Sequence, residues 1–341
     1  MRAVRVHAYH EPARVDEVPE PRIEGPLDVL VRLGGAGVCR TDLHILEGQW
    51  AEKSGVSLPY VIGHENAGWV HEVGSAVEHL RPGDPVILHP LVTCGLCAAC
   101  RRGDDCHCEA QRFPGIDSDG GYAELVRTTA RSVVRLGPDV EPADVAPLAD
   151  AGLTAYHAVR KAVPLLPPGT TAVVIGVGGL GHIGIQCLHA LTAARVVALD
   201  RSEESLALAR SLGVTETVRV DGAESKAVLE LTDGKGAEVV FDFVAETGTP
   251  PVGLALTRRH GSYFVIGYGG MVEVPAIELI SREVAVVGNL VGSYTDLVEL
   301  MALAEAGTVR LTTKRFPLDE ALDALAELDA GRIHGRAVLV P

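Results

Sequence analysis

Short apolar runs separated by Gly and Pro dominate residues 1 to about 135. DVLVRLGGAGV, ENAGWVHEVG and PVILHP are examples, and none of them has a strong helical period. Runs of this kind, with turn residues between them, are typical of strands in an all-β sandwich or barrel. The first part of the chain is therefore predicted to be mainly antiparallel β structure.

From about residue 170 the pattern changes to buried strands that alternate with helices. TTAVVIG predicts a strand, and a glycine-rich turn leads from it into an apolar helix at about 180–193. The strand ARVVALD and a helix at about 203–212 follow, with Ser202 as N-cap and Gly213 as the residue that ends the helix. Further strands are EVVFDFV, SYFVIG and VAVVGNLVG. This alternation predicts a parallel doubly wound sheet of the Rossmann type.

The tail has a third pattern. Leu297 to about Ala306 and Leu318 to Asp329 have helical apolar spacing, and the final GRAVLVP reads as a strand. We expect this tail to return to the first domain. The predicted organisation is therefore a first domain of residues 1–152 and 291–341, and a second of residues 153–290.

Composition and charge narrow the class of protein. A chain of 341 residues with 47% apolar residues suits two domains that each bury a core. The net charge of −15 disfavours nucleic acid, whose phosphates require a basic surface. No apolar run is long enough to span a membrane, and MRAVRVHAYHEP lacks the apolar core of a signal peptide, so we expect a cytoplasmic location.

A dinucleotide fingerprint opens the second domain. The turn has the form GxGxxG between a predicted strand and a predicted helix, the context in which such a turn binds a pyrophosphate at the helix N-terminus. Asp200 ends the next strand, where a carboxylate favours NAD over NADP, although the neighbouring Arg201 softens that preference. The alternative is a glycine turn that serves packing alone. The predicted cofactor contacts here are Gly176, Gly178, Gly179, Leu180, Gly181, Asp200 and Arg201.

Five of the seven cysteines crowd into one loop. Cys94, Cys97, Cys100 and Cys108 have the spacing C-x2-C-x2-C-x7-C, which suits a closed tetrahedral zinc site. An iron–sulfur cluster, disulfides and free thiols are the alternatives. Cys106 has a spacing that would also let it close the site, and His107 is interpreted as a solvated loop residue.

Two further segments, GVCRTDLH and GHENAGWVHEVGSAV, contain a second set of zinc-type ligands, Cys39 and His64. A catalytic zinc site needs three protein ligands and an open position. Taken singly, a cysteine after a strand or a lone histidine is more often structural, so the residue types alone leave this site open.

The order of these motifs resembles the zinc-containing alcohol dehydrogenases of the medium-chain dehydrogenase/reductase family. The resemblance rests on Cys39-x-Thr41-Asp42-x-His44, on GHE-x2-G, on the four-cysteine loop and on GxGxxG, and it spans essentially the whole chain including GRAVLVP. It implies a GroES-like catalytic domain beside the NAD-binding Rossmann domain. It also implies two zinc ions per chain, one catalytic and one structural.

The resemblance assigns roles to individual residues. Cys39 and His64 match two ligands of the catalytic zinc, and Asp150 stands where many relatives have the third ligand, a cysteine. Some relatives with secondary-alcohol activity have Asp there. Glu65 matches an acid that can swing onto the metal, and Asp42 one that orients His64.

The remaining matches concern the proton and the cofactor. Thr41 matches the hydroxyl that accepts the alcohol proton, and His44 the outer end of a relay through the nicotinamide ribose. Arg40 and Arg336 match residues at the pyrophosphate, and Thr154 one beside the nicotinamide. A solvated polar residue is the alternative for Thr41, His44 and Arg336.

These matches predict hydride transfer between NAD and an alcohol or ketone, with secondary alcohols favoured. Polyol, threonine or aldehyde-type dehydrogenases, zinc-free reductases and a non-enzymatic nucleotide-binding protein are the alternatives. Trp50 and residues near Leu290 are predicted to line the substrate pocket, although Trp50 fits core packing equally well. A homodimer or homotetramer is expected, paired through the VAVVGNLV edge strand.

Overall fold

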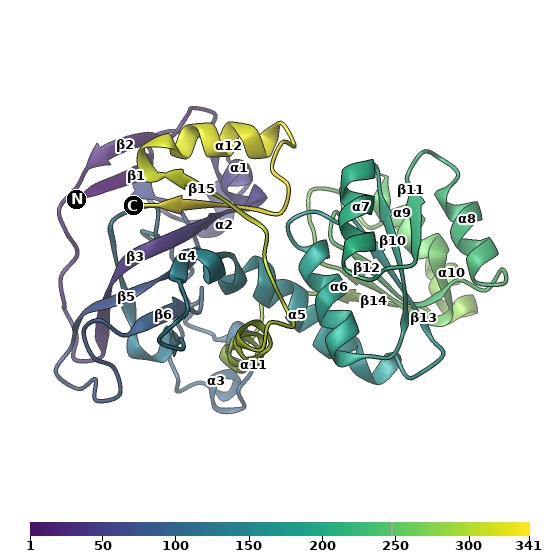
Figure 1. Ribbon diagram of the computed structural model, residues 1–341, viewed down its shortest axis with the longest axis horizontal. Coiled ribbons are helices and arrows are strands. Elements are labelled where there is room, and N and C mark those ends of the chain that lie inside the picture. Colours follow the sequence, from purple (N-terminus) through teal and green to yellow (C-terminus); the bar gives the residue numbers. More distant parts are fainter. Residues whose placement is uncertain (247) are drawn as a thin grey trace. The chain divides into compact units, whose positions relative to one another are not determined.

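The computed structural model describes residues 1–246 and 248–341. They form two compact units, one of Met1–Leu153 with Gly292–Pro341 and one of Thr154–Val291. Figure 1 follows the chain through both of them in colour. Mainly antiparallel sheets in the first unit and a parallel sheet in the second confirm the predicted fold class.

The first unit contains two sheets. A small antiparallel sheet has the order β2-β1-β4, and a seven-stranded sheet has the order β15-β16-β3-β5-β6-β8, with β7 also paired to β3. The C-terminal strand β16 pairs with β3, Ala337 opposite Val38, so the tail completes this sheet. The strands are β1 (Arg2–Val6), β2 (Arg14–Glu17), β3 (Asp28–Val38), β4 (Tyr60–Val61), β5 (Glu65–Val73), β6 (Pro85–Leu88), β7 (Leu125–Thr129), β8 (Val133–Arg135), β15 (Thr313–Pro317) and β16 (Arg336–Val340).

Short helices interrupt these strands. Those among the first 145 residues are four to seven residues long, too short to show a helical period in the sequence. The tail helix α11 begins three residues earlier than predicted because Ser293 caps it, its Oγ accepting the Asp296 N–H at 3.1 Å. The helices are α1 (Arg40–Leu46), α2 (Ala51–Ser54), α3 (Ala98–Arg101), α4 (Pro142–Val145), α11 (Tyr294–Glu305) and α12 (Ala321–Asp329), and α5 (Ala151–Ala162) leads into the second unit.

The second unit is a six-stranded parallel sheet with the order β11-β10-β9-β12-β13-β14. Helices α6 and α7 pack together, as do α8 and α9, and a core of Val, Ile and Leu side chains lies against the sheet. The strands are β9 (Thr171–Ile175), β10 (Arg195–Asp200), β11 (Glu216–Arg219), β12 (Ala237–Asp242), β13 (Thr257–Val265) and β14 (Ala285–Gly288). The helices are α6 (Gly181–Leu191), α7 (Glu203–Ser211), α8 (Glu224–Leu231), α9 (Thr249–Leu256) and α10 (Ala276–Arg282).

The strand order reverses at β9, whose two neighbours, β10 and β12, lead to opposite edges of the sheet. In doubly wound sheets, ligands bind beyond the carboxyl ends of the strands at this switch point. The predicted GxGxxG turn lies there, directly after β9. Edge strand β11 and helix α8 were not predicted from the sequence. Few residues of either element are fully buried.

Single turns of 3-10 helix complete the list of elements, at Asp105–His107, Ala130–Ser132, Ala146–Ala149, Val163–Leu165 and Leu318–Glu320. Across residues 1–246 and 248–341, no helix is both long and apolar enough to cross a membrane.

Candidate functional site

Four candidate ligands from three separate parts of the first unit meet in one place. Cys39, His64, Glu65 and Asp150 each offer a ligand atom, and these atoms all lie within 4.8 Å of one another. The register of the sheet explains the meeting, because Gly37 of β3 lies opposite Glu65 of β5. Cys39 and His64 therefore flank the same end of this strand pair, and Asp150 joins them from the turn before α5. We call these four residues the mixed cluster.

Gly63 fixes the backbone just before His64. It has a φ of 100°, and a Cβ at this position would lie 2.1 Å from the Tyr122 ring. Only glycine combines this left-handed conformation with so close an approach. The glycine of the GHE segment is thus required for the backbone that presents His64.

His64 is only 1% exposed, yet neither of its ring nitrogens has a hydrogen-bond partner in the described structure. Nδ1 lies 3.4 Å from Asp42 Oδ1, and Nε2 lies 3.4 Å from Asp150 Oδ2. Buried polar groups without partners are rare and call for an explanation. An Nε2 lone pair that faces a thiol and a carboxylate is what a bound cation would satisfy, so the residues fit a metal ion.

The negative charge around His64 also favours a bound cation. Burial by itself opposes protonation of the ring, but the charge of Asp42 and the nearby Asp150 carboxylate outweigh it and raise the pKa of His64 well above its ordinary value. The mixed cluster is therefore a region of negative potential that stabilises a positive charge.

Asp42 lies beside the mixed cluster, next to Nδ1 of His64. It is fully buried, and its Oδ2 accepts the Cys39 N–H at 2.9 Å and the Tyr122 hydroxyl at 2.6 Å. One carboxylate thus fixes the start of α1 and lies against the His64 ring. Tyr122 was not predicted, since a single tyrosine in GGYAEL has no sequence signal for this contact. Burial and the Asp42 charge raise the pKa of Tyr122, so it stays a donor.

Glu65 is held from two sides. Its Oε1 accepts the Ala151 N–H at 3.1 Å, and its Oε2 forms an ion pair with Arg336. Burial raises the pKa of Glu65, and the Arg336 charge opposes that rise. Arg336 is only 3% exposed, and its guanidinium contacts the mixed cluster through this ion pair. The pyrophosphate role predicted for Arg336 is a separate one. That predicted role stays a prediction.

The predicted relay residues lie on α1, whose N-cap residue is Cys39. Thr41 and His44 are three positions apart and so share one face of the helix. Thr41 is half-buried, His44 is buried and Arg40 is exposed. Trp50 packs against the core of the first unit, which favours its structural interpretation over a role in the substrate pocket.

The four predicted cysteines of the second metal site also meet, with ligand atoms within 4.8 Å of one another. The N–H groups of Leu96 and Cys97 donate to Cys94 Sγ at 3.4 and 3.3 Å, and the Cys94 N–H donates to Cys108 Sγ at 3.3 Å. Donors of this kind stabilise thiolates, and those from Cys100 and Glu109 lower the pKa of Cys97 to about 6. We call this set the thiol cluster; its cysteines are free thiols, and it fits a tetrahedral zinc ion.

Cys108, and not Cys106, lies together with the other three cysteines of the loop. Cys106 points to Asp104 and His107, with its Sγ 3.5 Å from Asp104 Oδ1 and 3.3 Å from His107 Nδ1. It lies outside the thiol cluster, whereas Cys108 belongs to it. The His107 side chain is 61% exposed, in keeping with a solvated loop residue.

The glycine-rich turn of the second unit has the shape that a dinucleotide requires. Gly176 has a φ of 86°, and a Cβ at Gly178 would meet open space. Asp200 holds the turn, its Oδ2 accepting the Val177 N–H at 2.7 Å and its Oδ1 the Ser202 N–H at 2.8 Å. An open glycine at a helix N-terminus, next to a carboxylate, fits NAD. The other predicted cofactor residues lie at this turn (Gly179, Leu180, Gly181), just after β10 (Arg201) and on α5 (Thr154).

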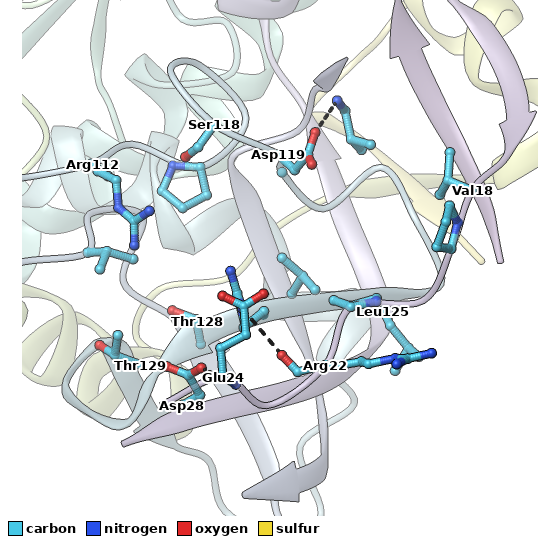
Figure 2. A pocket seen from close by; sticks show the side chains of 18 of the residues that line it. Val18, Arg22, Glu24, Asp28, Arg112, Ser118, Asp119, Leu125, Thr128 and Thr129 are labelled. Atoms are coloured by element: carbon cyan, nitrogen blue, oxygen red, sulfur yellow. Dashed lines mark hydrogen bonds and ion pairs between the residues drawn. The ribbon is translucent and has the colours of Figure 1, made fainter. Parts of the chain in front are cut away.

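A separate hollow of about 800 Å³ lies in the first unit. Figure 2 shows its walls, which come from residues 18–28, residues 112–120 and β7. No predicted site residue lines it. Its polar groups serve local structure, as where Asp119 accepts the Val61 N–H at 2.9 Å, so we assign it no chemistry.

Comparisons with known proteins agree with this geometry. Residues 25–138 match the alcohol dehydrogenase GroES-like domain, and residues 179–306 match the zinc-binding dehydrogenase domain. An NAD-dependent alcohol dehydrogenase of Sulfurisphaera tokodaii is 35% identical, with 100% of both chains covered. A D-arabinose 1-dehydrogenase (NADP⁺) of Saccharolobus solfataricus is also 35% identical, over 100% of this chain and 97% of its own.

Among solved structures, the alcohol dehydrogenase of the archaeon Aeropyrum pernix is 48% identical, with a TM-score of 0.98 over 100% of both chains. The chain therefore belongs to the zinc-type alcohol dehydrogenases of the medium-chain dehydrogenase/reductase family. It is an oxidoreductase, and the predicted family is confirmed.

Proposed function

We propose that this enzyme uses zinc and NAD to interconvert alcohols, secondary alcohols above all, and the corresponding ketones. The mixed cluster is the observation that supports the proposal most strongly. There a buried imidazole, a thiol and two carboxylates converge, and both His64 nitrogens lack hydrogen-bond partners. A site with these donors on a dehydrogenase fold fits a catalytic metal better than a purely structural one, whose ligands form a closed set of four.

Cys39, His64 and Asp150 are the proposed ligands of the catalytic zinc. When bound, zinc supplies Lewis-acid chemistry that lowers the pKa of an alcohol and polarises a carbonyl. Asp42 orients the His64 ring through Nδ1, in the way that carboxylates commonly fix metal-binding histidines. Glu65 is held near the cluster by Arg336 and the Ala151 N–H, as a carboxylate that can approach the ion.

The proton of the alcohol leaves through side chains of α1. Thr41 accepts it at its hydroxyl oxygen and releases its own hydroxyl proton toward His44, which lies on the same face of the helix and passes a proton onward. Because the Asp42 carboxylate ties the start of α1 to the mixed cluster, the relay residues keep a fixed position beside the ligands.

The glycine-rich turn of the second unit is the proposed NAD site, with the dinucleotide phosphates at Gly178 and the N-terminus of α6. When bound, NAD supplies the acceptor for the hydride of the alcohol carbon. Asp200, already bonded to Val177 and Ser202, has lone pairs left for a ribose hydroxyl and repels a 2′-phosphate. The roles of Arg40 and Arg336 at the pyrophosphate, of Thr154 at the nicotinamide and of Arg201 in cofactor preference stay predictions.

The thiol cluster is the proposed site of a second, structural zinc. The spacing, the thiolate-stabilising N–H donors and the exclusion of Cys106 support a closed set of four thiolates. Two zinc ions per chain are therefore expected in the purified enzyme.

A homodimer through β14 is the proposed assembly. This strand is an edge of the parallel sheet, and its residues are exposed or half-buried. Its own Val286 is 40% exposed, and Leu290, two residues after the strand, is 48% exposed. An exposed apolar edge strand pairs readily with a second copy. Val286→Lys should convert the dimer to a monomer in light-scattering measurements, and an unchanged mass would contradict this interface.

A turnover assay tests the proposed function. The panel holds secondary and primary alcohols, ketones and, because one relative is a D-arabinose 1-dehydrogenase, D-arabinose, each with NAD and NADP. We expect the highest kcat/KM for a secondary alcohol with NAD. Preferred oxidation of D-arabinose with NADP would instead place the enzyme with that relative, and no turnover of any member would contradict the proposal.

A further inference from the structure

A buried carboxylate of the second unit takes no part in the chemistry described above. Asp242 is the last residue of β12 and is 0% exposed. Within residues 1–246 and 248–341 it forms no ion pair with a basic side chain. A buried carboxylate is costly unless hydrogen bonds compensate for the lost water, so its partners reveal what it is there to hold.

Those partners lie on two different segments. Asp242 Oδ1 accepts the N–H groups of Val244 at 3.0 Å and of Ala245 at 2.7 Å. Asp242 Oδ2 accepts the hydroxyl of Tyr263, on β13, at 2.7 Å. Tyr263 is itself fully buried, and burial, with the hydrogen bond to Asp242, raises its pKa, so it remains a donor. One side chain thus ties the end of β12 and the segment after it to the next strand.

The segment that follows β12 needs such a support. Ala245 has a φ of 44°, in the left-handed region that residues with a Cβ rarely adopt. A strained backbone persists only where its surroundings determine it. The shortest hydrogen bond of Asp242 to this segment, from the Ala245 N–H, falls at the strained residue.

This segment packs on the glycine-rich turn. The Phe243 N–H donates to Ile175 O at 3.0 Å, one residue before the turn begins. A Cβ at Gly176 would lie 2.5 Å from Val244 Cγ2, and a Cβ at Gly184 would lie 2.5 Å from Phe243 Cζ. Residues 243–245 therefore form a wall against the turn and the first part of α6.

We propose that Asp242 is a positioning residue for the dinucleotide. It fixes the wall of residues 243–245 and, through Val244 and Phe243, the shape of the Gly176–Gly181 turn at the switch point of the sheet. This inference rests on the proposal that NAD binds at that turn. Asp242 acts on cofactor affinity through the backbone and is not one of the proposed metal ligands.

The test measures the Kd of NADH by fluorescence titration for a set of variants. Asp242→Ala removes all three accepted hydrogen bonds, and we expect its Kd to rise about tenfold or more. Asp242→Asn keeps an oxygen for the two N–H groups and turns its amide toward the Tyr263 oxygen, so its Kd should stay within about threefold of wild type. Adding Ala245→Gly to Asp242→Ala removes the strain and should recover part of the affinity.

Matched measurements separate positioning from general loss of stability. Asp296→Ala removes another buried carboxylate, in the first unit, that accepts the Ser293 N–H at 2.8 Å. It should lower Tm and leave the Kd of NADH unchanged. Asp242→Ala should raise the KM for NAD with kcat at saturating NAD nearly unchanged, and its zinc content should equal that of wild type.

Equal NADH affinity of wild type and folded Asp242→Ala would overturn the inference, as would a fall in Tm without a change in Kd. If Asp242→Ala does not fold, Tyr263→Phe tests the inference instead, because it removes one of the three hydrogen bonds that the Asp242 side chain accepts. A raised Kd would support the inference, and an unchanged Kd would refute it. A wild-type enzyme that binds no NADH would instead refute the proposed NAD site itself.

Discussion

The mixed cluster and the thiol cluster both belong to the first unit, yet they are built in opposite ways. The thiol cluster takes every ligand from one loop, and the N–H groups of that same loop donate to its sulfurs. The mixed cluster takes its candidate ligands from the residue after β3, from the start of β5 with the residue before it, and from the turn before α5, and it depends on the register that places Gly37 opposite Glu65. The first depends on a local conformation and the second on the packing of the whole unit.

The surroundings of the two clusters differ as well. Cys94 of the thiol cluster is exposed, whereas His64 and Glu65 are 1% and 0% exposed. Two carboxylates at the mixed cluster are buried: Asp42, beside it, accepts the Tyr122 hydroxyl, and Glu65, within it, pairs with Arg336. A closed, local site suits a structural ion, and a buried, charged site with ligands from several elements suits catalysis. Substitutions in the two clusters should therefore affect different properties.

The largest effect is expected for Cys39→Ala. Losing the metal's contribution of several kcal/mol should lower kcat by about a thousandfold or more, with the fold intact. The measurement is steady-state turnover together with circular dichroism and NADH affinity, which should both match wild type. A Cys39→Ala enzyme with full activity would contradict the proposal that Cys39 binds the catalytic zinc.

Next comes Arg336→Ala, which leaves the buried Glu65 carboxylate without its cation. Breaking a buried ion pair of this kind costs about 3–5 kcal/mol of unfolding free energy. The exposed pair of Arg2 and Glu124, with side chains 41% and 36% exposed, supplies the control, and Arg2→Ala should hardly change stability. Chemical denaturation measures both; equal losses for the two variants would contradict the role of burial.

Cys97→Ser tests the thiol cluster. Loss of the proposed structural ion should lower Tm by roughly 5–15 °C, while the protein that remains folded keeps a kcat near wild type. Metal content should fall from two ions per chain to one. A Cys97→Ser enzyme that keeps its Tm but loses its activity would reverse the roles of the two clusters.

Asp42→Asn should have an intermediate effect. Asparagine keeps an oxygen for Tyr122 and the Cys39 N–H, but it lacks the charge that faces His64 Nδ1. Replacing a carboxylate that orients a metal-binding histidine costs about 10- to 100-fold in metal affinity or activity. Zinc titration against a chelator measures this; unchanged affinity would show that Asp42 serves α1 alone.

The smallest effect is expected for Cys106→Ala, the control for Cys97→Ser. Cys106 is 1% exposed and lies outside the thiol cluster, so its loss should cost only about 1 kcal/mol. Metal analysis should still find two ions per chain. A loss of one ion would show that Cys106, and not Cys108 alone, takes part in binding.

The same contrast between local and assembled sites explains which parts of the fold and of the site could be predicted from the sequence. The thiol cluster and the glycine-rich turn are local motifs, so their spacing predicts them, and the two sheets follow from the period of the apolar residues. Cys39 and His64 became recognisable only through resemblance to a family, because spacing cannot show which distant segments meet. Tyr122 and the Glu65–Arg336 pair had no signal, since strand register and burial alone bring them together.

Asp150 is the residue on which the mixed cluster most needs a direct test, because it stands where many relatives have cysteine. Crystals of the purified enzyme, measured by anomalous diffraction above and below the zinc absorption edge, provide it. We predict two zinc peaks per chain, one among the four thiols and one bonded to Cys39 Sγ, His64 Nε2 and an Asp150 oxygen. A chain fully loaded at the thiol cluster with no peak between Cys39, His64 and Asp150 would contradict the proposed catalytic site.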